Sequence, residues 1–400
     1  EEFSNSLHTG TFNSKGEDES QLRWEAKERS LANTLIDHVT KFSEYLFTES
    51  GGETELLNPY RKATEAERIL NLAAYHHHKT NAFLSHTFND KKYRKENVSR
   101  NVRAKKVGAT PPADDSVSFP EHLISNLLWN GFIKRGTSPD DPIHDRFKLA
   151  PLLMTMLMHY GGIRQCEALH LYVEDIQKDP LGRIVIRIYH PIDGLAPQHY
   201  RNLSGISSRA TRHEYLMKQF GLEDRWTATK KSYHAGWKEP ALADNKHKFF
   251  FVYFCPTEIG CLFYDLLRVY IKDQRKVRLE NNRETHPFLF TNKDGNPLSM
   301  KSFTDFHDAA VKKLGLKPMR EDGLSGHPHR HAYKKRLEQI KTSPVIIKEL
   351  MHHNSIISQE DYGKATNTEI YNALSNVFPL SMQDNIITDK ISSELGVNDE

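Results

Sequence analysis

Apolar residues recur at helical spacing in the first part of the chain. Within residues 21–50 they fall three or four positions apart, which places them on one face of an amphipathic helix. The residues of this face are Leu31, Leu35, Val39, Phe42 and Leu46. A second helical block follows at 64–88. Together they predict a small helical domain over residues 21–106.

A different pattern begins near residue 119. Residues 119–133 and 147–160 are apolar enough to be core helices, and Gly161-Gly162 ends the second one with a helix-stop signal. Residues 183–190 and 248–256 have the alternating or aromatic composition of strands. The chain beyond 256 is again mainly helical. The predicted fold class is therefore mainly α with a small antiparallel β-sheet (α+β).

The polar segments between these blocks give the expected boundaries. Residues 1–20 lack a period and are expected to be disordered. Residues 107–118, with paired prolines, form a linker. A larger domain then covers 119–380, with an insertion at 192–235 between its two strands, and 381–400 form a C-terminal tail.

Composition limits the classes of protein that remain. The chain has 400 residues, 38% of them hydrophobic, which is enough for two or three domains with cores. It has no apolar run of eighteen residues, so a membrane role is not expected. We expect the protein to lie in the cytoplasm. Three cysteines favour a reducing interior over a disulfide scaffold. The chain begins with Glu1 rather than Met, which leaves open whether residues precede it.

The net charge indicates little about binding partners, but the distribution of charge along the chain indicates more. The formal charge is only +3, yet residues 91–106 hold eight basic residues against one acid. Such a run is suited to contacts with DNA phosphates, and a solvated basic linker is the alternative. The predicted DNA-binding residues are Lys91, Lys92, Arg94, Lys95, Arg100, Arg103, Lys105 and Lys106.

Three motifs carry the candidate chemistry. In GGIRQCEALHL, residues 161–171, a glycine turn delivers Arg164 to a helix start. Arginine is the side chain for bidentate contact with phosphate. An ordinary ion pair with Glu167 on one helix face is the alternative.

The second motif is HPHRHAYKKRL, residues 327–337. His327 and Arg330 are three apart and share a helix face, so both can address one anion. His329 and His331 point elsewhere, which argues against a metal cage on a helix. An extended His-x-His-x-His strand could still chelate zinc. The His76-His77-His78 triplet has the same difficulty, since consecutive helical residues point in three directions.

The third motif is LMHHNSIISQEDYGKA, residues 350–365, where Tyr362 follows His353 by nine positions. The order of the groups matters more than any one of them. An arginine on a glycine turn, a lysine near a strand, a His-x-x-Arg pair, a histidine and then a tyrosine form a set of phosphate-handling groups that ends in a possible nucleophile.

With these motifs the sequence resembles the tyrosine recombinase, or phage-type integrase, family over roughly residues 119–375. The resemblance implies an N-terminal helical core-binding domain before a catalytic domain. It implies catalytic roles for Arg164, His327, Arg330 and His353, with Tyr362 as the nucleophile and Glu167 and His331 as supporting residues. Tyr371 is a weaker nucleophile candidate because its context differs.

Two positions depart from the family pattern. The family commonly has Leu-Gly-His where this chain has Met351-His352-His353, so the local turn is expected to differ. The insertion also blurs the catalytic lysine, for which Lys238 is our choice and Lys246 and Lys248 are alternatives.

The resemblance implies a site-specific recombinase or integrase of a mobile element that cuts and rejoins DNA through a 3′-phosphotyrosyl intermediate, without metal or cofactor. It implies double-stranded DNA as partner, a homodimer on one site and a homotetramer in synapsis. A helix after the tyrosine could dock on a neighbouring protomer or pack on its own domain. The alternatives are a type IB topoisomerase-like or resolvase-like enzyme, or an inactive DNA-binding relative.

Overall fold

The structure is a computed structural model, and it describes residues 2–13, 16–81, 97–102, 105, 117–352, 367–374 and 382–395. The chain divides into two compact units, Glu1–Asp114 and Asp115–Glu400. The division falls within the expected linker, residues 107–118. The two units are described separately.

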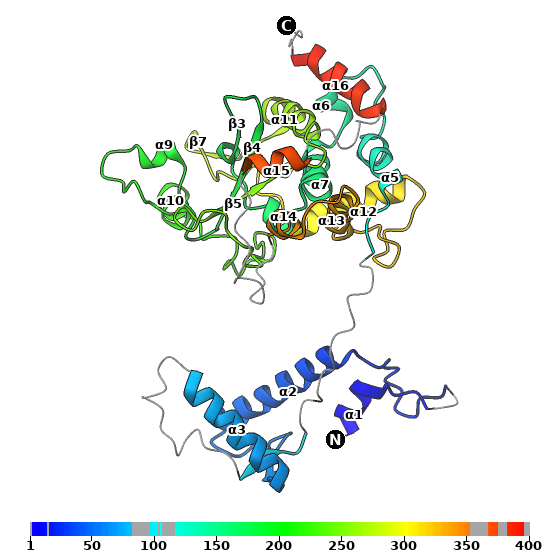
Figure 1. The fold of residues 1–400 in the computed structure, drawn as a ribbon, viewed down its shortest axis with the longest axis vertical. Coiled ribbons are helices and arrows are strands. Elements are labelled where there is room, and N and C mark those ends of the chain that lie inside the picture. The colour runs from blue at the N-terminus through cyan, green and yellow to red at the C-terminus, as the bar shows by residue number, and fades with distance from the viewer. Residues whose placement is uncertain are drawn as a thin grey trace. The chain divides into compact units, whose positions relative to one another are not determined.

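The first unit is built on two long helices (Figure 1). One short strand lies between these helices in the chain and pairs antiparallel with a second strand that follows them, with Tyr60 opposite Arg100. Residues 2–9, expected to be disordered, instead form a helix, because Leu7 packs against Ala32 and Ile36 of the next helix. The elements are α1 (Glu2–Thr9), α2 (Arg29–Glu49), β1 (Tyr60–Lys62), α3 (Glu65–Asn81) and β2 (Val98–Arg100).

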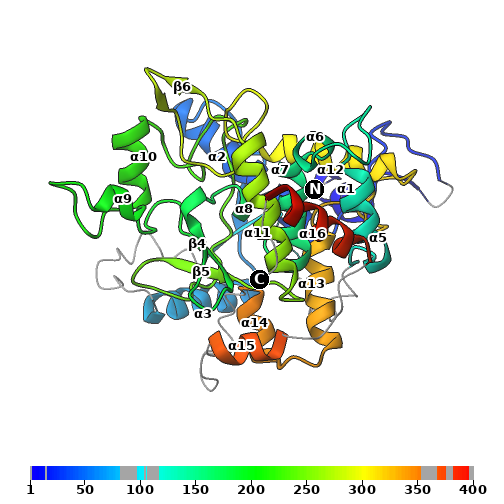
Figure 2. The same cartoon turned by 90° about the horizontal axis from the view of Figure 1, so that it is seen from above.

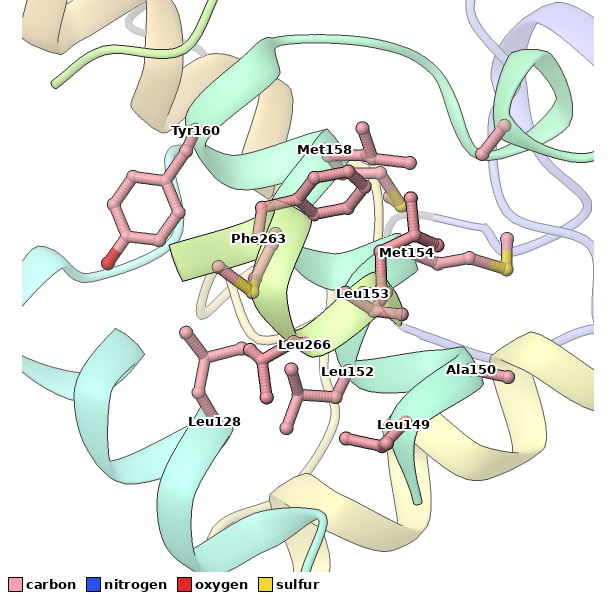
Figure 3. Close-up of a cluster of buried hydrophobic side chains, with 14 of the residues drawn as sticks. Leu128, Leu149, Ala150, Leu152, Leu153, Met154, Met158, Tyr160, Phe263 and Leu266 are labelled. Carbon is pink, nitrogen blue, oxygen red and sulfur yellow. The ribbon is translucent and has the colours of Figure 1, made fainter. Parts of the chain in front are cut away.

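The second unit is organised around α7 (Leu149–Gly161), in which every residue is buried. This explains its nearly continuous apolar sequence: the helix has no solvent face. Helices α11 (Ile259–Val269), α12 (Met300–Lys313) and α13 (Pro328–Gln339) pack around it. Figure 3 shows the resulting contacts, with Phe263 and Leu266 of α11 lying against Leu153 and Leu152 of α7.

A small sheet lies beside this helical core. Its order is β3-β4-β5, all antiparallel, with Ile186 of β4 opposite Val252 of β5. The expected fold class, mainly α with a small antiparallel sheet, is confirmed. The strands are β3 (Ile176–Lys178), β4 (Ile184–Tyr189) and β5 (Phe249–Val252), and a separate hairpin comprises β6 (Leu279–Glu280) and β7 (Arg283–Glu284).

The remaining elements connect these layers. The π-helical turns η2 and η4 continue α5 and α11. The bounds are α5 (Glu121–Asn126), η2 (Leu127–Gly131), α6 (Ile143–Arg146), α8 (Gln165–Ala168), η3 (Val173–Asp175), α9 (Gln198–Arg201), α10 (Arg212–Phe220), η4 (Tyr270–Gln274) and α14 (Pro344–Leu350). Among the described residues, none of the helices is both long enough and apolar enough to cross a bilayer.

The insertion is a packed part of the unit. Tyr200 and Tyr215 of the insertion form a small core together with Tyr172 and Phe288 of the surrounding unit. Two buried arginines fasten the insertion: Arg212 pairs with Asp175, and Arg225 donates to the carbonyls of Leu169, Tyr233 and Leu298 at 2.9, 2.8 and 2.7 Å. Buried backbone carbonyls need donors, so each arginine satisfies groups that the irregular loops leave unpaired.

The C-terminal segments fold back on the same unit. In α15 (Asn367–Leu374), Ile370 and Leu374 are buried against α13 and α14. Residues 381–400 were expected to be a tail, but α16 (Met382–Leu395) packs on α11, as Figure 2 shows. The reason is its apolar stripe, since Ile387 and Ile391 join the main core.

Candidate active site

The glycine turn after α7 is held between the sheet and α13. A Cβ on Gly161 would lie 2.6 Å from Cγ1 of Val252, and one on Gly162 would lie 2.2 Å from Cδ1 of Tyr333. Gly162 also has φ +68°, which glycine adopts without strain. The two glycines therefore allow the backbone before Arg164 to approach both neighbours.

Arg164 begins α8 and is oriented by Glu167. Its Nη1 donates to Glu167 Oε1 at 2.6 Å, while its backbone N–H donates to Oε2 at 2.7 Å. The Glu167 side chain is fully buried, whereas the Arg164 side chain is 24% exposed. The Arg164–Glu167 ion pair, which was the alternative interpretation of this motif, is therefore present. It is compatible with anion binding because it holds a partly exposed guanidinium in place.

Arg330 ties the three motifs together. One of its terminal nitrogens donates to the carbonyl of Gly162 and the other to the carbonyl of Met351. Arg330 is only 3% exposed, and burial lowers the pKa of its guanidinium to about 10, so it stays charged at neutral pH. A guanidinium has five N–H donors, so three remain after these two bonds.

His327 stands at the exposed start of α13, with three arginines near it. Partial burial, followed by the charges of Arg320, Arg330 and Arg164, lowers its pKa below the usual range. His331 packs its ring perpendicular to that of His327, with centroids 4.7 Å apart. His331, the predicted supporting residue, therefore contacts His327 through its ring.

The Met351-His352 turn departs from the family sequence but keeps a glycine-like conformation. His352 has φ +50°, in the left-handed region that glycine adopts most easily and histidine tolerates better than most residues. Its ring is buried against Phe250, with centroids 4.1 Å apart. Packing of its ring on Phe250 thus stabilises His352 in this left-handed conformation, which carries some backbone strain.

Lys238 lies on a segment that reaches the same turn. The N–H of Ala241 donates to the carbonyl of His352 at 3.2 Å, and the carbonyl of Gly236 lies 3.3 Å from Nε2 of His170. Lys238 itself is exposed. The segment 236–241 therefore contacts both the arginine motif and the last motif, and Lys238 as the catalytic lysine stays a prediction.

Several predicted residues lie outside the described parts of the chain. These are His353, Tyr362, Lys91, Lys92, Arg94, Lys95, Arg103 and Lys106. Of the basic run, Lys105 is exposed, but Arg100 is engaged within its own unit. It pairs with Glu44, donates to the carbonyl of Asn58 and stacks on Tyr60, so its guanidinium is held within this unit.

Sequence reasoning missed a buried histidine chain beside the site. His329 Nδ1 lies 3.0 Å from His159 Nδ1, and its Nε2 lies 2.8 Å from His307 Nε2. The available signal was His159, a polar residue inside the apolar run of α7. Among the described residues no group of three His, Cys, Asp or Glu side chains has the arrangement of a metal site.

The geometry defines a class of site: two arginines and a histidine converge from α8 and α13 and suit a phosphate group. Comparisons with known proteins show a family likeness over part of the chain. Residues 259–369 match the sequence model of the Phage integrase family, which confirms the predicted resemblance over this segment. The segment contains His327, Arg330, His353 and Tyr362, while Arg164 and Lys238 precede it.

The curated relatives include the tyrosine recombinase XerC of Lacticaseibacillus casei and that of Lacticaseibacillus paracasei. Each is 24% identical over 115 residues, which is 28% of this chain and 37% of the relative. Among solved structures, the Tn1549 transposon integrase with transposon right-end DNA has a TM-score of 0.37 and 14% identity, over 90% of this chain and 85% of the other. The XerH recombinase on difH substrate has a TM-score of 0.40 and 14% identity, over 90% and 72%.

Proposed function

We propose that this protein is a site-specific DNA recombinase or integrase that breaks and rejoins duplex DNA through a 3′-phosphotyrosyl intermediate. The observation that carries the proposal is Arg330, which joins the Arg164 turn to the turn that precedes His353. Motifs separated by up to 190 residues in sequence thereby surround one cationic site. Its substrate would be a DNA phosphodiester of a mobile element.

In this mechanism the hydroxyl oxygen of Tyr362 attacks phosphorus, and the bond to the 5′ oxygen breaks. Arg164 and Arg330 hold the non-bridging oxygens and stabilise the charge of the transition state. His327, kept neutral by its lowered pKa, accepts the tyrosine proton. Lys238 gives a proton to the leaving 5′ oxygen, and His353 donates a hydrogen bond to the phosphate. The covalent bond retains the energy needed for rejoining.

Tyr371 is the less suitable nucleophile on structural grounds. Its hydroxyl donates to the carbonyl of Ile184 at 3.5 Å, and its ring lies under the guanidinium of Arg183. Burial raises the pKa of this hydroxyl. These contacts of Tyr371 support Tyr362 as the attacking group in the proposed mechanism.

Strand exchange needs two duplexes, so we propose a homodimer on each site and a homotetramer in synapsis. Lys105 and the other lysines and arginines of the 91–106 run, Arg100 excepted, would contact the DNA backbone. Such an enzyme would work in the cytoplasm at the nucleoid.

Covalent trapping tests the proposal. A library of nicked duplexes of random sequence is incubated with the protein, so that the short fragment released by cleavage diffuses away and the adduct accumulates. We expect protein-linked DNA from the wild type and from Tyr371→Phe, and none from Tyr362→Phe. An adduct that persists in Tyr362→Phe contradicts the nucleophile, and no adduct from the wild type contradicts the activity.

A further inference from the structure

The three buried histidines next to the site have no part in the chemistry described above. His159 comes from α7, His307 from α12 and His329 from the first turn of α13. All three side chains are at most 1% exposed. Phe119 covers the central one, with its ring stacked on that of His329 at 4.1 Å.

Their hydrogen bonds form one directed chain. Arg336 Nη2 lies 2.6 Å from His159 Nε2, and because arginine only donates, this nitrogen accepts. His159 then carries its hydrogen on Nδ1 and donates to His329 Nδ1, and His329 donates from Nε2 to His307 Nε2. The hydrogen of His307 is left on Nδ1, 3.9 Å from Oδ1 of Asp308.

In the described part of the protein, Glu121 opposes this direction. Its Oε2 lies 3.3 Å from His159 Nε2, where an acceptor would require a hydrogen on that nitrogen. The contact from Arg336 is shorter, and Arg336 also satisfies the carboxylate itself, at 2.7 and 3.0 Å. Arg336 therefore decides the tautomer of His159, and through it those of the other two histidines.

Two rings of the chain, those of His159 and His329, are neutral at working pH. Burial and then the charge of Arg336 lower the pKa of His159 to about 4. Burial, His307, His159 and Arg336 lower the pKa of His329 well below its usual range. A proton added to either ring would place two N–H groups face to face.

The position of His329 connects this chain to the site. It stands between His327 and Arg330, and successive residues of a helix are separated by a fixed rotation of about 100°. Hydrogen bonds at both ring nitrogens of His329 therefore fix the rotation of the first turn of α13. This rotation sets the directions in which the side chains of His327 and Arg330 leave the backbone. His159 in turn lies three residues before Gly162, whose carbonyl accepts from Arg330.

We propose that His159, His329 and His307 form a hydrogen-bonded chain that positions His327 and Arg330 against Arg164 for strand cleavage. His329 and His307 are then positioning residues, an inference that rests on the proposed function. Apolar residues could fill the same volume, but only a hydrogen bond at each ring nitrogen sets the orientation of the ring.

His307 offers a matched test because its described bond within the chain uses Nε2 alone. In His307→Gln the side-chain amide can reach the position of that nitrogen, whereas His307→Leu keeps the volume and removes the bond. Cleavage rate at saturating nicked duplex, DNA affinity and melting temperature are measured for both. His122→Gln, an exposed histidine of α5, is the control.

We expect His307→Leu to cleave at least tenfold more slowly with unchanged DNA affinity, and His307→Gln to stay within about threefold of the wild type. A folded His307→Leu that cleaves at the wild-type rate overturns the positioning role while the proposed function stands. A wild type that forms no adduct overturns the proposed function itself.

A second measurement remains informative if His307→Leu does not fold. Nitrogen-15 NMR of the histidine rings in the wild type reports which nitrogen carries each hydrogen. We expect Nδ1 for His159 and His307 and Nε2 for His329, without any DNA present. A hydrogen on Nδ1 of His329 overturns the directed chain.

Discussion

At the scale of single residues, the site depends on how its charged groups are oriented and neutralised. Glu167 is buried beside two arginines, and Arg330 donates two hydrogen bonds to backbone carbonyls. The sequence predicts Arg164, His327 and Arg330 from motif and spacing. It does not predict which partner holds each one, because those partners come from other elements.

Removing the charge of Glu167 tests the orientation of Arg164. Glutamine retains one acceptor but turns an N–H₂ group toward the arginine. We expect Glu167→Gln to slow cleavage roughly 10- to 100-fold at saturating DNA. The control is Glu214→Gln, whose partner Lys218 is exposed, so that this surface pair contributes little. Equal rates for both variants would contradict the role of Glu167.

The protonation of His327 predicts a dependence on pH. The group must be neutral to accept the tyrosine proton, and its pKa is lowered below 6.5. We therefore expect the cleavage rate to fall only when the pH drops below that value. Arg320→Gln removes a nearby positive charge, which raises the pKa and moves the acid limb of the pH–rate profile upward. An unchanged limb would show that His327 does not control it.

At the scale of elements, the glycine turn joins α7, β5 and α13. The sequence predicts the turn and both neighbouring helices, because helix periodicity and glycine signals are local. It does not predict that Tyr333 packs on Gly162, since the two are 171 positions apart. The sequence also does not predict the continuation of α5 into a π-helical turn.

A comparison of Gly162 with Gly221, the glycine after α10, separates the effect of backbone strain from that of close packing. Gly162 and Gly221 have φ of 68° and 65°, but only Gly162 has atoms within 4 Å of an added Cβ. We expect Gly221→Ala to cost about 1–2 kcal/mol from backbone strain. Gly162→Ala should cost roughly 2–5 kcal/mol, because the clash with Tyr333 adds to the strain. Urea unfolding measures both, and equal losses would contradict the close packing.

At the scale of the whole molecule, the C-terminal helix closes the second unit on itself. The indole N–H of Trp129 donates to Asp384 of α16 at 2.6 Å, and Glu394 accepts from the backbone N–H of Ile143. Residues 381–400 were predicted to be a C-terminal tail, yet Ile387 and Ile391 of this region are buried. Both residues enter the core.

The stability contribution of α16 can be measured at Asp384. Asp384→Ala leaves the buried indole N–H without this partner, and we expect a loss of about 1–3 kcal/mol. Asp389→Ala, an exposed residue of the same helix, should change stability by less than about 0.5 kcal/mol. If Asp384→Ala also changed the free energy of unfolding by less than about 0.5 kcal/mol, α16 would not contribute to the stability of the folded unit.

The most direct test of the account is the mass of the peptide that carries the DNA. After trapping and digestion with trypsin, Tyr362 falls in residues 349–364 and Tyr371 in residues 365–390. The account predicts the nucleotide remnant on Tyr362 in the first peptide. A remnant on any other residue would contradict the central claim that Tyr362 attacks a phosphate held by Arg164 and Arg330.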